Sequence, residues 1–186
     1  MHRPAFRSLL SAAAAALALA CGARDRADAH LRSVHVAGVR IDPRAEVPIV
    51  DLVEDGGAER KLGIWVGEFE ADSIARAMAH EPAARPNPHD LLKNLLDSLD
   101  AHVRRTVVTE LRAGTYFAEI DLELRGRRIS IDARPSDAIA IALRAGAPML
   151  VQESLFESAE PPGDEPSLDI DWRTHFRRET RGAAPL

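Results

Sequence analysis

The sequence feature that most constrains the fold is a strand that leads almost directly into a helix within residues 128–146. Residues 128–131 (RISI) alternate polar and apolar side chains, which is the pattern of a strand with one buried face. Pro135 suits the first helical position, because its ring fixes φ there and the N–H that it lacks would have had no partner. Ile139 and the alanines around it form a smooth apolar face, and Gly146 is a suitable residue to end the helix. This helix is therefore expected to lie close against a sheet.

Four polar side chains stand at this strand-to-helix junction: Asp132, Arg134, Ser136 and Asp137. In a functional interpretation, the two carboxylates bind a hard divalent cation and Arg134 binds a phosphate group. In a structural interpretation, Ser136 and Asp137 cap the helix, and Arg134 pairs with Asp132 to hold the turn. Both interpretations stay open, and residue types favour the structural one because Ser and Asp are ordinary residues of a first helical turn.

The remaining pattern predicts a single α+β domain, in which a mixed, mostly antiparallel sheet of six to seven strands packs with three main helices. Besides the junction strand, we expect strands over residues 31–41, 47–54, 60–66, 101–111, 116–124 and 148–151. Besides the junction helix, we expect one helix over residues 68–80 and another from residue 88 onward. The helix from residue 88 carries leucines that we expect to form a buried stripe: Leu91, Leu92, Leu95, Leu96 and Leu99.

His89 and Asp90 open this helix, after a proline-rich loop. Asn87 suits its N-cap and Pro88 its first position. A histidine at such a helix start is a candidate general base near neutral pH. The alternative is structural, with Asp90 capping the helix and His89 packing over the loop, and residue types favour this alternative slightly.

The formal net charge of −5 argues against a strongly basic surface for nucleic acid. A phosphate contact must then come from a local cluster of basic side chains. Arg125, Arg127 and Arg128 form one candidate cluster at the hairpin tip that opens the junction strand, although arginines on an exposed turn need no special function. The chain has no Gly-rich phosphate loop, GxSxG, HExxH or Cys/His zinc spacing, so the common enzyme signatures are missing.

The first 20 residues have the features of an export signal, which is not part of the fold. Arg3 and Arg7 supply its positive charge, and residues 9–20 (LLSAAAAALALA) supply its apolar stretch. That stretch is too short for a comfortable transmembrane helix. We therefore expect an exported protein, either an envelope lipoprotein or a periplasmic protein of a bacterium.

The only cysteine, Cys21, follows the apolar stretch directly, as in the lipobox of bacterial lipoproteins. This predicts lipidation of Cys21, with membrane contact through that anchor alone and residues 21–30 as a tether. The alternatives are an ordinary signal cut near Ala20 or Ala23, or an uncleaved anchor. A single cysteine excludes an internal disulfide.

The chain changes character after Gln152. Residues 153–171 contain seven acidic residues and no Lys or Arg, and residues 172–181 then carry four arginines. We expect the domain to cover residues 31–152, and residues 153–186 to form a disordered tail that is first acidic and then basic.

Four stretches resemble, in this order, the bifunctional nuclease family, also called the DNase/RNase or BFN domain: LGIWVGEFEADSIARAM, PHDLLKNLL, VVTELRAGTYFAEIDLE and IDARPSDAIAIALRAGAPMLV. The resemblance covers about residues 33–152, and the ordered combination is far more specific than any one stretch. It implies an α+β domain that commonly associates, and nuclease activity on both DNA and RNA. The family's most constant polar positions fall here on Glu70, His89, Asp90, Asp132, Arg134, Ser136 and Asp137.

The resemblance implies a nuclease that works on nucleic acid as a homo-oligomer. Hydrolysis would then use Mg²⁺ or Mn²⁺, bound by Glu70, Asp132 and Asp137, to activate water and offset phosphate charge. Arg134 would stabilise the transition state, and His89 or a metal-bound hydroxide would supply the base. The expected catalytic residues are His89, Asp90, Asp132, Arg134, Ser136 and Asp137.

The alternative is a non-catalytic, oligomeric binding module tethered in the cell envelope, in which the polar cluster is an architectural joint or a small-ligand site. The acidic balance and the lack of an evident nucleic-acid groove favour it. Two features of the folded chain would separate the hypotheses. The first is whether Glu70, Asp90, Asp132 and Asp137 surround one open cavity, and the second is whether the arginines of residues 125–128 face it.

Overall fold

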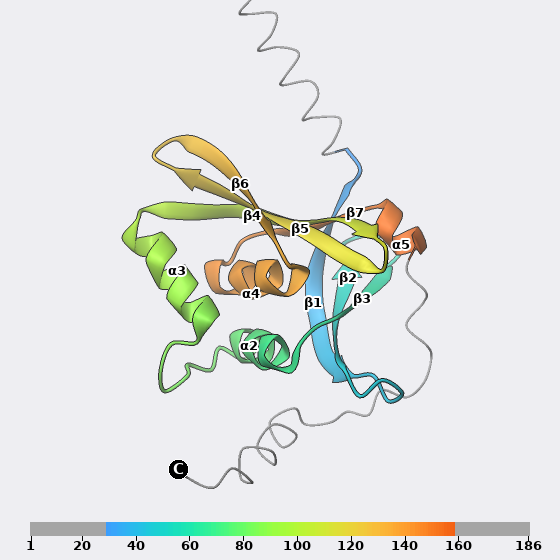
Figure 1. Cartoon of the computed structure of the whole chain (residues 1–186). Coiled ribbons are helices and arrows are strands. Elements are labelled where there is room, and N and C mark those ends of the chain that lie inside the picture. The colour runs from blue at the N-terminus through green and yellow to red at the C-terminus, as the bar shows by residue number, and fades with distance from the viewer. Residues whose placement is uncertain (1–28, 159–186) are drawn as a thin grey trace, which may run out of the picture. The chain divides into compact units, whose positions relative to one another are not determined.

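The computed structural model describes residues 29–158, so the predicted export signal, Cys21 and residues 159–186 lie outside the described part. No helix of the described part is long and apolar enough to cross a membrane. Its elements, in chain order, are β1 (Leu31–Ile41), β2 (Pro48–Glu54), β3 (Lys61–Trp65), α2 (Glu68–Met78), α3 (Pro88–Ser98), β4 (Ala101–Arg112), β5 (Thr115–Leu124), β6 (Arg127–Ala133), α4 (Pro135–Ala145), β7 (Met149–Gln152) and α5 (Ser154–Ser158) (Figure 1).

The seven strands of residues 29–158 form one sheet in the order β3-β2-β1-β7-β4-β5-β6. β7 runs parallel to β4, whereas the pairs β1–β2, β2–β3, β4–β5 and β5–β6 are antiparallel. The predicted α+β class, with a mixed, mostly antiparallel sheet and three main helices, is confirmed. β6, the strand that leads into α4, lies at an open edge of this sheet.

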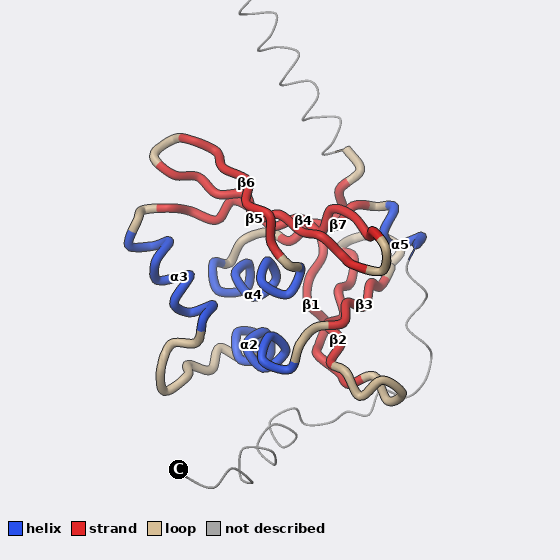
Figure 2. Tube along the Cα trace, in the orientation of Figure 1, coloured by secondary structure: helices blue, strands red, loops and turns tan. Residues whose placement is uncertain are grey.

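α4 is the helix around which the other elements pack (Figure 2). It contacts β4 and β5 of the sheet, and also α2 and α3. Its alanines let these neighbours approach closely, and its two isoleucines reach different parts of the core. Ile139 packs with apolar residues of β1, β2 and β3, and Ile141 with those of β4 and β5. The helix ends at Gly146, whose φ of +61° fits the predicted end.

The expected leucine stripe of α3 is buried only in part. Leu96 is buried and Leu92 partly so, but Leu91, Leu95 and Leu99 are 64%, 52% and 52% exposed. α3 contacts α4 and β4, so only a narrow face of the helix finds apolar partners. The expectation that all five leucines are buried is therefore wrong.

The domain continues past the predicted boundary at Gln152. α5 follows β7 almost at once, and its Leu155 is 4% exposed within the core. Glu153 pairs with Arg32 (2.7 Å) and with Arg60 (3.4 Å), which fixes the start of this segment to the domain. The boundary was predicted too early, because a short apolar helix was hidden in an acidic stretch.

Replacing Leu52, which is 1% exposed, by Ala is expected to lower the free energy of unfolding by about 2–5 kcal/mol, because it opens a cavity in a close-packed core. Leu91→Ala removes the same atoms from a side chain that is 64% exposed, and should change stability by no more than about 0.5 kcal/mol. Urea unfolding followed by circular dichroism measures both. Equal losses in the two variants would contradict the packing of β2 in the core.

Candidate functional site

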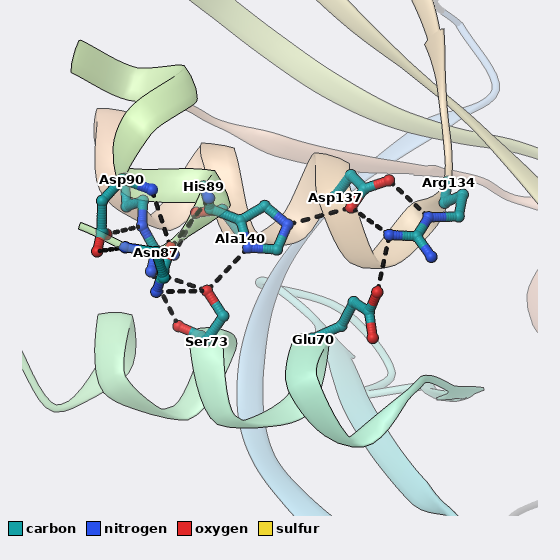
Figure 3. A network of polar contacts seen from close by, with 9 residues as sticks. Glu70, Ser73, Asn87, His89, Asp90, Arg134, Asp137 and Ala140 are labelled. Carbon is teal, nitrogen blue, oxygen red and sulfur yellow. Dashed lines mark hydrogen bonds and ion pairs between the residues drawn. The ribbon is translucent and has the colours of Figure 1, made fainter. Parts of the chain in front are cut away.

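The first turns of α2, α3 and α4 meet, and their polar side chains form one network (Figure 3). Glu70 comes from α2, His89 from α3 and Asp137 from α4, while Arg134 is the N-cap residue of α4. Arg134 and Glu70 are 64 positions apart in the sequence, yet their side chains are hydrogen-bonded. The packing of α4 against both other helices therefore gathers four of the expected site residues.

Arg134 bridges the carboxylates of Glu70 and Asp137. Its Nε donates to Asp137 Oδ2 (2.7 Å), and its Nη2 donates to Asp137 Oδ1 (2.8 Å) and to Glu70 Oε1 (2.8 Å). The Arg134 guanidinium, helped by the hydrogen bond to His89, lowers the pKa of Asp137 although burial opposes this. The carboxylates of Asp137 and Glu70 raise the pKa of Arg134. Asp137 and Arg134 are therefore both charged at neutral pH.

The ring of His89 is held from both sides. Its Nδ1 lies 2.8 Å from Ser73 Oγ, and its Nε2 lies 3.1 Å from Asp137 Oδ1. Ser73 Oγ also accepts from Asn87 Nδ2 (3.1 Å) and Arg144 Nη2 (2.9 Å), and these two groups can only donate. Because both lone pairs of the Ser73 hydroxyl are used, its hydrogen must go to Nδ1 of His89. His89 therefore carries its ring proton on Nε2 and donates it to Asp137.

Asn87 is the N-cap of α3, as predicted. Its Oδ1 accepts from the backbone N–H groups of His89 (2.9 Å) and Asp90 (3.0 Å), which leaves Nδ2 to donate to Ser73. Asp90 accepts from the backbone N–H of Asn87 (2.9 Å), so its expected capping role is confirmed. Its other oxygen accepts from Arg144 Nε (2.7 Å). Burial raises the pKa of Asp90, but the hydrogen bonds from Arg144 and Asn87 outweigh burial and lower it.

Arg134 is the most accessible member of this network. Its side chain is 65% exposed, against 19% for Glu70 and 26% for Asp137. Its Nη1 has no hydrogen-bond partner within residues 29–158. No described side chain caps α2 or α4, so the positive ends of two helix dipoles adjoin the guanidinium. Within the described part of the chain, the exposed Nη1 of Arg134 is therefore the one donor of this guanidinium that is left for a ligand from solvent.

Asp132, which was also expected in the site, lies elsewhere. It is exposed on β6, opposite Glu119 of β5. Successive side chains of a strand point to opposite faces, and the preceding Ile131 lies beside the buried Ile120, so Asp132 points away from α4. The expected pair of Asp132 with Arg134 is wrong, because the guanidinium faces the network instead.

Two further differences concern serine residues. Ser136 is buried in the first turn of α4, and within the described part no hydrogen bond joins it to the network; neither Ser136 nor Asp137 caps the helix as expected. Ser73 and Arg144 belong to the network but were not predicted. Ser73 follows Glu70 by three positions, so that both lie on one face of α2, and this spacing would have indicated it. Arg144 has no comparable signal.

The polar side chains of the network do not together line either of the two best-formed cavities of residues 29–158. A cavity of about 420 Å³ lies beside Asp90 and Arg144, and Glu70, Arg134 and Asp137 are not in its lining.

The three arginines of the proposed phosphate patch, Arg125, Arg127 and Arg128, are also distant from the site. They lie at the opposite end of β6 from α4. From Arg127 to Ala133 the strand takes six steps of about 3.3 Å, or roughly 20 Å.

The carboxylates do not fit a divalent cation in this arrangement. The guanidinium of Arg134 donates to both oxygens of Asp137 and to Oε1 of Glu70, which leaves only Oε2 of Glu70 as a cation ligand from these two carboxylates. Asp132, the third expected ligand, points away from them. Among residues 29–158, no group of three or more His, Cys, Asp or Glu side chains is placed to hold a metal ion. The positive charge between these carboxylates comes from Arg134.

Asp137→Asn is expected to lower the free energy of unfolding at pH 7 by about 1.5–3 kcal/mol, because it weakens the charge-assisted bonds with Arg134. The pKa of Asp137 is depressed in the folded chain, so its stabilisation is present above the unfolded pKa, about 3.9. The stabilisation is lost as the pH falls through the lower, folded pKa. Urea unfolding between pH 7 and pH 3 should show the gap between the two proteins narrowing below about pH 4.

Asp97→Asn is the matched control, since Asp97 is 57% exposed and pairs with Lys93 on one helix face. It should change stability by no more than about 0.5 kcal/mol at any pH. A gap between the wild type and Asp137→Asn that does not depend on pH would contradict the ion pair with Arg134.

Comparison of the sequence with known proteins identifies the family to which this chain is related. Residues 50–163 match the model of the bifunctional nuclease domain. An uncharacterized protein of Mycobacterium tuberculosis is 34% identical over 126 residues, which are 68% of this chain and 74% of that protein. Bifunctional nuclease 1 of Arabidopsis thaliana is 33% identical over 130 residues, and bifunctional nuclease 2 of Oryza sativa subsp. japonica is 32% identical over 131 residues.

These two matches cover 67% and 68% of this chain, but 40% of each plant protein. The matched region of the family model includes all three helices that build the polar network. With more than half of its length in that match, the chain belongs to the bifunctional nuclease domain family.

Proposed function

We propose that this protein is a nuclease that hydrolyses phosphodiester bonds of DNA, RNA or both at the network of α2, α3 and α4. The observation that carries the proposal is the exposed guanidinium of Arg134, held between two carboxylates beside two uncapped helix N-termini. In a chain of net charge −5, Arg134 presents one exposed positive charge at the start of α4, and a phosphodiester oxygen would bind to its free Nη1. The names of the plant relatives support the same activity.

Arg134 has the geometry to bind the scissile phosphate. Asp137 and Glu70 fix its Nε and Nη2, and its Nη1 is left to donate to phosphate oxygens. A guanidinium oriented in advance stabilises the negative charge that develops as water attacks. Arg134 is thus assigned to transition-state stabilisation.

Glu70 is the candidate base. Its Oε1 accepts from Arg134, whereas its Oε2 makes no hydrogen bond within residues 29–158 and is left to take a proton from an attacking water. His89 acts through Asp137 in this proposal, because both its ring nitrogens are bonded and its side chain is 11% exposed. Ser73, Asn87 and Arg144 hold His89, and His89 holds Asp137 behind Arg134.

A non-catalytic binding module is the second candidate. It is favoured by the fact that both nitrogens of His89 and both oxygens of Asp137 are already bonded, as in a purely architectural joint. Arg134 would then bind an anionic ligand without cleaving it. Binding of nucleic acid without cleavage would distinguish this candidate.

The full chain should cleave single-stranded or duplex DNA or RNA, and Arg134→Ala should lower kcat/KM by about 10²–10³-fold, as does the loss of one transition-state donor. Arg104→Ala is the matched control, because Arg104 is 57% exposed, pairs with Glu123 (3.6 Å) and lies outside the network. It should keep the full rate. Gel assays with labelled substrates measure cleavage, and circular dichroism verifies folding.

Equal cleavage by wild type and Arg134→Ala would point to a contaminating nuclease and overturn the proposal. The assay is also run in EDTA and with added Mg²⁺ or Mn²⁺. Because Arg134 supplies the positive charge, cleavage should persist in EDTA. Loss in EDTA and recovery on adding metal would show that a cation takes part, as the resemblance implies, and would contradict this assignment.

Self-association is also part of the proposal. The described domain exposes seven large apolar side chains, five of them on α3 and β6: Leu91, Leu95, Leu99, Ile129 and Ile131, with Trp65 and Phe69 elsewhere. Exposed apolar side chains are typical of protein–protein contacts where they gather in a patch. A homo-oligomer would cover them.

We further propose that the protein is exported and anchored by a lipid on Cys21, which lies outside the described residues. The proposal rests on the charges of Arg3 and Arg7 and on the apolar stretch that ends directly before Cys21. Expressed in a bacterium, the chain should incorporate labelled palmitate and sediment with membranes, and Cys21→Ser should do neither. A wild-type chain that stays unlabelled and free of the membrane would contradict the anchor.

A further inference from the structure

Among residues 29–158, β6 is an edge strand with one unpaired side. It is the last strand of the sheet that these residues form, and β5 is its only neighbour among them. Six of its seven residues are exposed, among them Ile129 (38%) and Ile131 (44%). An edge strand presents a row of unpaired N–H and C=O groups that another strand can bind. The charged and apolar side chains of β6 determine which second strand can pair with it.

The turn before β6 determines which of its backbone groups face outward. Arg125 and Gly126 have φ of +51° and +74°, and they connect the paired residues Leu124 and Arg127. This is a two-residue hairpin turn of type I′, in which the N–H of Arg127 bonds back to Leu124. Because the direction alternates along a strand, the N–H and C=O groups of Arg128, and of every second residue after it, point away from β5.

We propose that β6 of a second copy of this chain pairs antiparallel with β6, centred on Ser130, so that two sheets join into one. In this register Ser130 lies opposite Ser130 of the second copy, and Arg128 lies opposite its Asp132. These are the residues whose backbone groups point outward, so all of them form interchain hydrogen bonds. The contact has two-fold symmetry, as the commonest homodimers do.

Charge complementarity identifies the second copy as the partner. Within residues 29–158, neither Arg128 nor Asp132 forms an ion pair, although Arg128 lies opposite Glu123 of β5, which pairs with Arg104. Asp132 lies instead opposite Glu119, and like charges directly opposite each other destabilise a sheet. In the proposed register each Asp132 meets an Arg128 of the other copy, and the symmetry makes this contact twice. The repulsion from Glu119 is thereby offset.

The apolar side chains match in the same register. Ile129 lies opposite Ile131 of the second copy, and Ile131 opposite its Ile129. Both lie on the sheet face where Leu122 and Ile120 are buried under the helices. The core cluster of one copy would therefore continue into that of the other. If the register shifted by one residue, backbone groups that point towards β5 would lie opposite groups that point outward, and the interchain hydrogen bonds would be lost. If it shifted by two residues, Arg128 could lie opposite Ser130 and would lose its contact with Asp132.

Cross-linking tests the centre of the register. In the full chain with Cys21→Ser, Ser130→Cys places two cysteines opposite each other with Cα atoms about 5.5 Å apart, within the range of a disulfide. Mild oxidation should convert most of this variant into a covalent dimer on a non-reducing gel. Ser33→Cys, at an exposed serine of the interior strand β1, is the matched control and should give no covalent dimer. No covalent dimer, or equal amounts from both variants, would overturn the proposal.

A charge exchange tests the pairing of Arg128 with Asp132. Arg128→Asp or Asp132→Arg alone creates two like-charge pairs, and should weaken dimerisation by about tenfold or more. The double variant restores two opposite-charge pairs and should return the dissociation constant to near that of the wild type. Sedimentation equilibrium of the full chain measures all four proteins. A monomeric wild type, or a double variant as weak as the single ones, would contradict the proposal.

This inference rests on the proposed self-association and not on the nuclease activity. Both experiments are done without substrate. A chain that dimerises through β6 but cleaves nothing would overturn the proposed activity alone, and a monomeric nuclease would overturn the interface alone.

Discussion

The burial of α4 is the constraint on which the rest of this domain depends. The helix has the sheet on one side and α2 and α3 on others, and such a position is open only to a helix of mostly small and aliphatic residues. Close packing on several sides buries Pro135 and Ser136 in the first turn of α4. A polar side chain at the start of α4 that faces α2 and α3 must therefore form hydrogen bonds with these helices, because a buried polar group without a partner lowers stability.

The polar network follows from that requirement. Ser73 is 3% exposed and His89 is 9% exposed. In the series of hydrogen bonds from Arg144 through Ser73 and His89 to Asp137, each group has a fixed role as donor or acceptor. A network satisfied in this way is rigid, and it fixes the charge of Asp137 at its accessible end. Arg134, which is bonded to Asp137, is the member of the network that is exposed to solvent. A group of fixed geometry thus reaches the surface at Arg134, outside the cavity that lies beside Asp90 and Arg144.

Much of the fold and part of the site were predictable, and the failures have physical causes. The junction of β6 and α4, the N-cap at Asn87 and the sheet class were read correctly because each depends on local sequence. Asp132 was misplaced because proximity in sequence does not show which face of a strand a side chain takes. The exposed leucines of α3 were misjudged because an amphipathic pattern does not reveal how wide a face its neighbours cover. Arg144 was missed because its contact with Ser73 bridges 71 positions of sequence.

The turn at Arg125 and Gly126 has a consequence for how this domain tolerates insertions. Exposed hairpin turns are usually the safest places to add residues, whether in evolution or when a tag is introduced. Here β6 is a short strand held at one end by the turn and joined at the other, through a single residue, to α4. An added residue that slipped β6 by one position would invert every side chain of the strand and pull on the start of α4. This turn should therefore keep its length even where its sequence drifts, unlike the longer segment between α2 and α3.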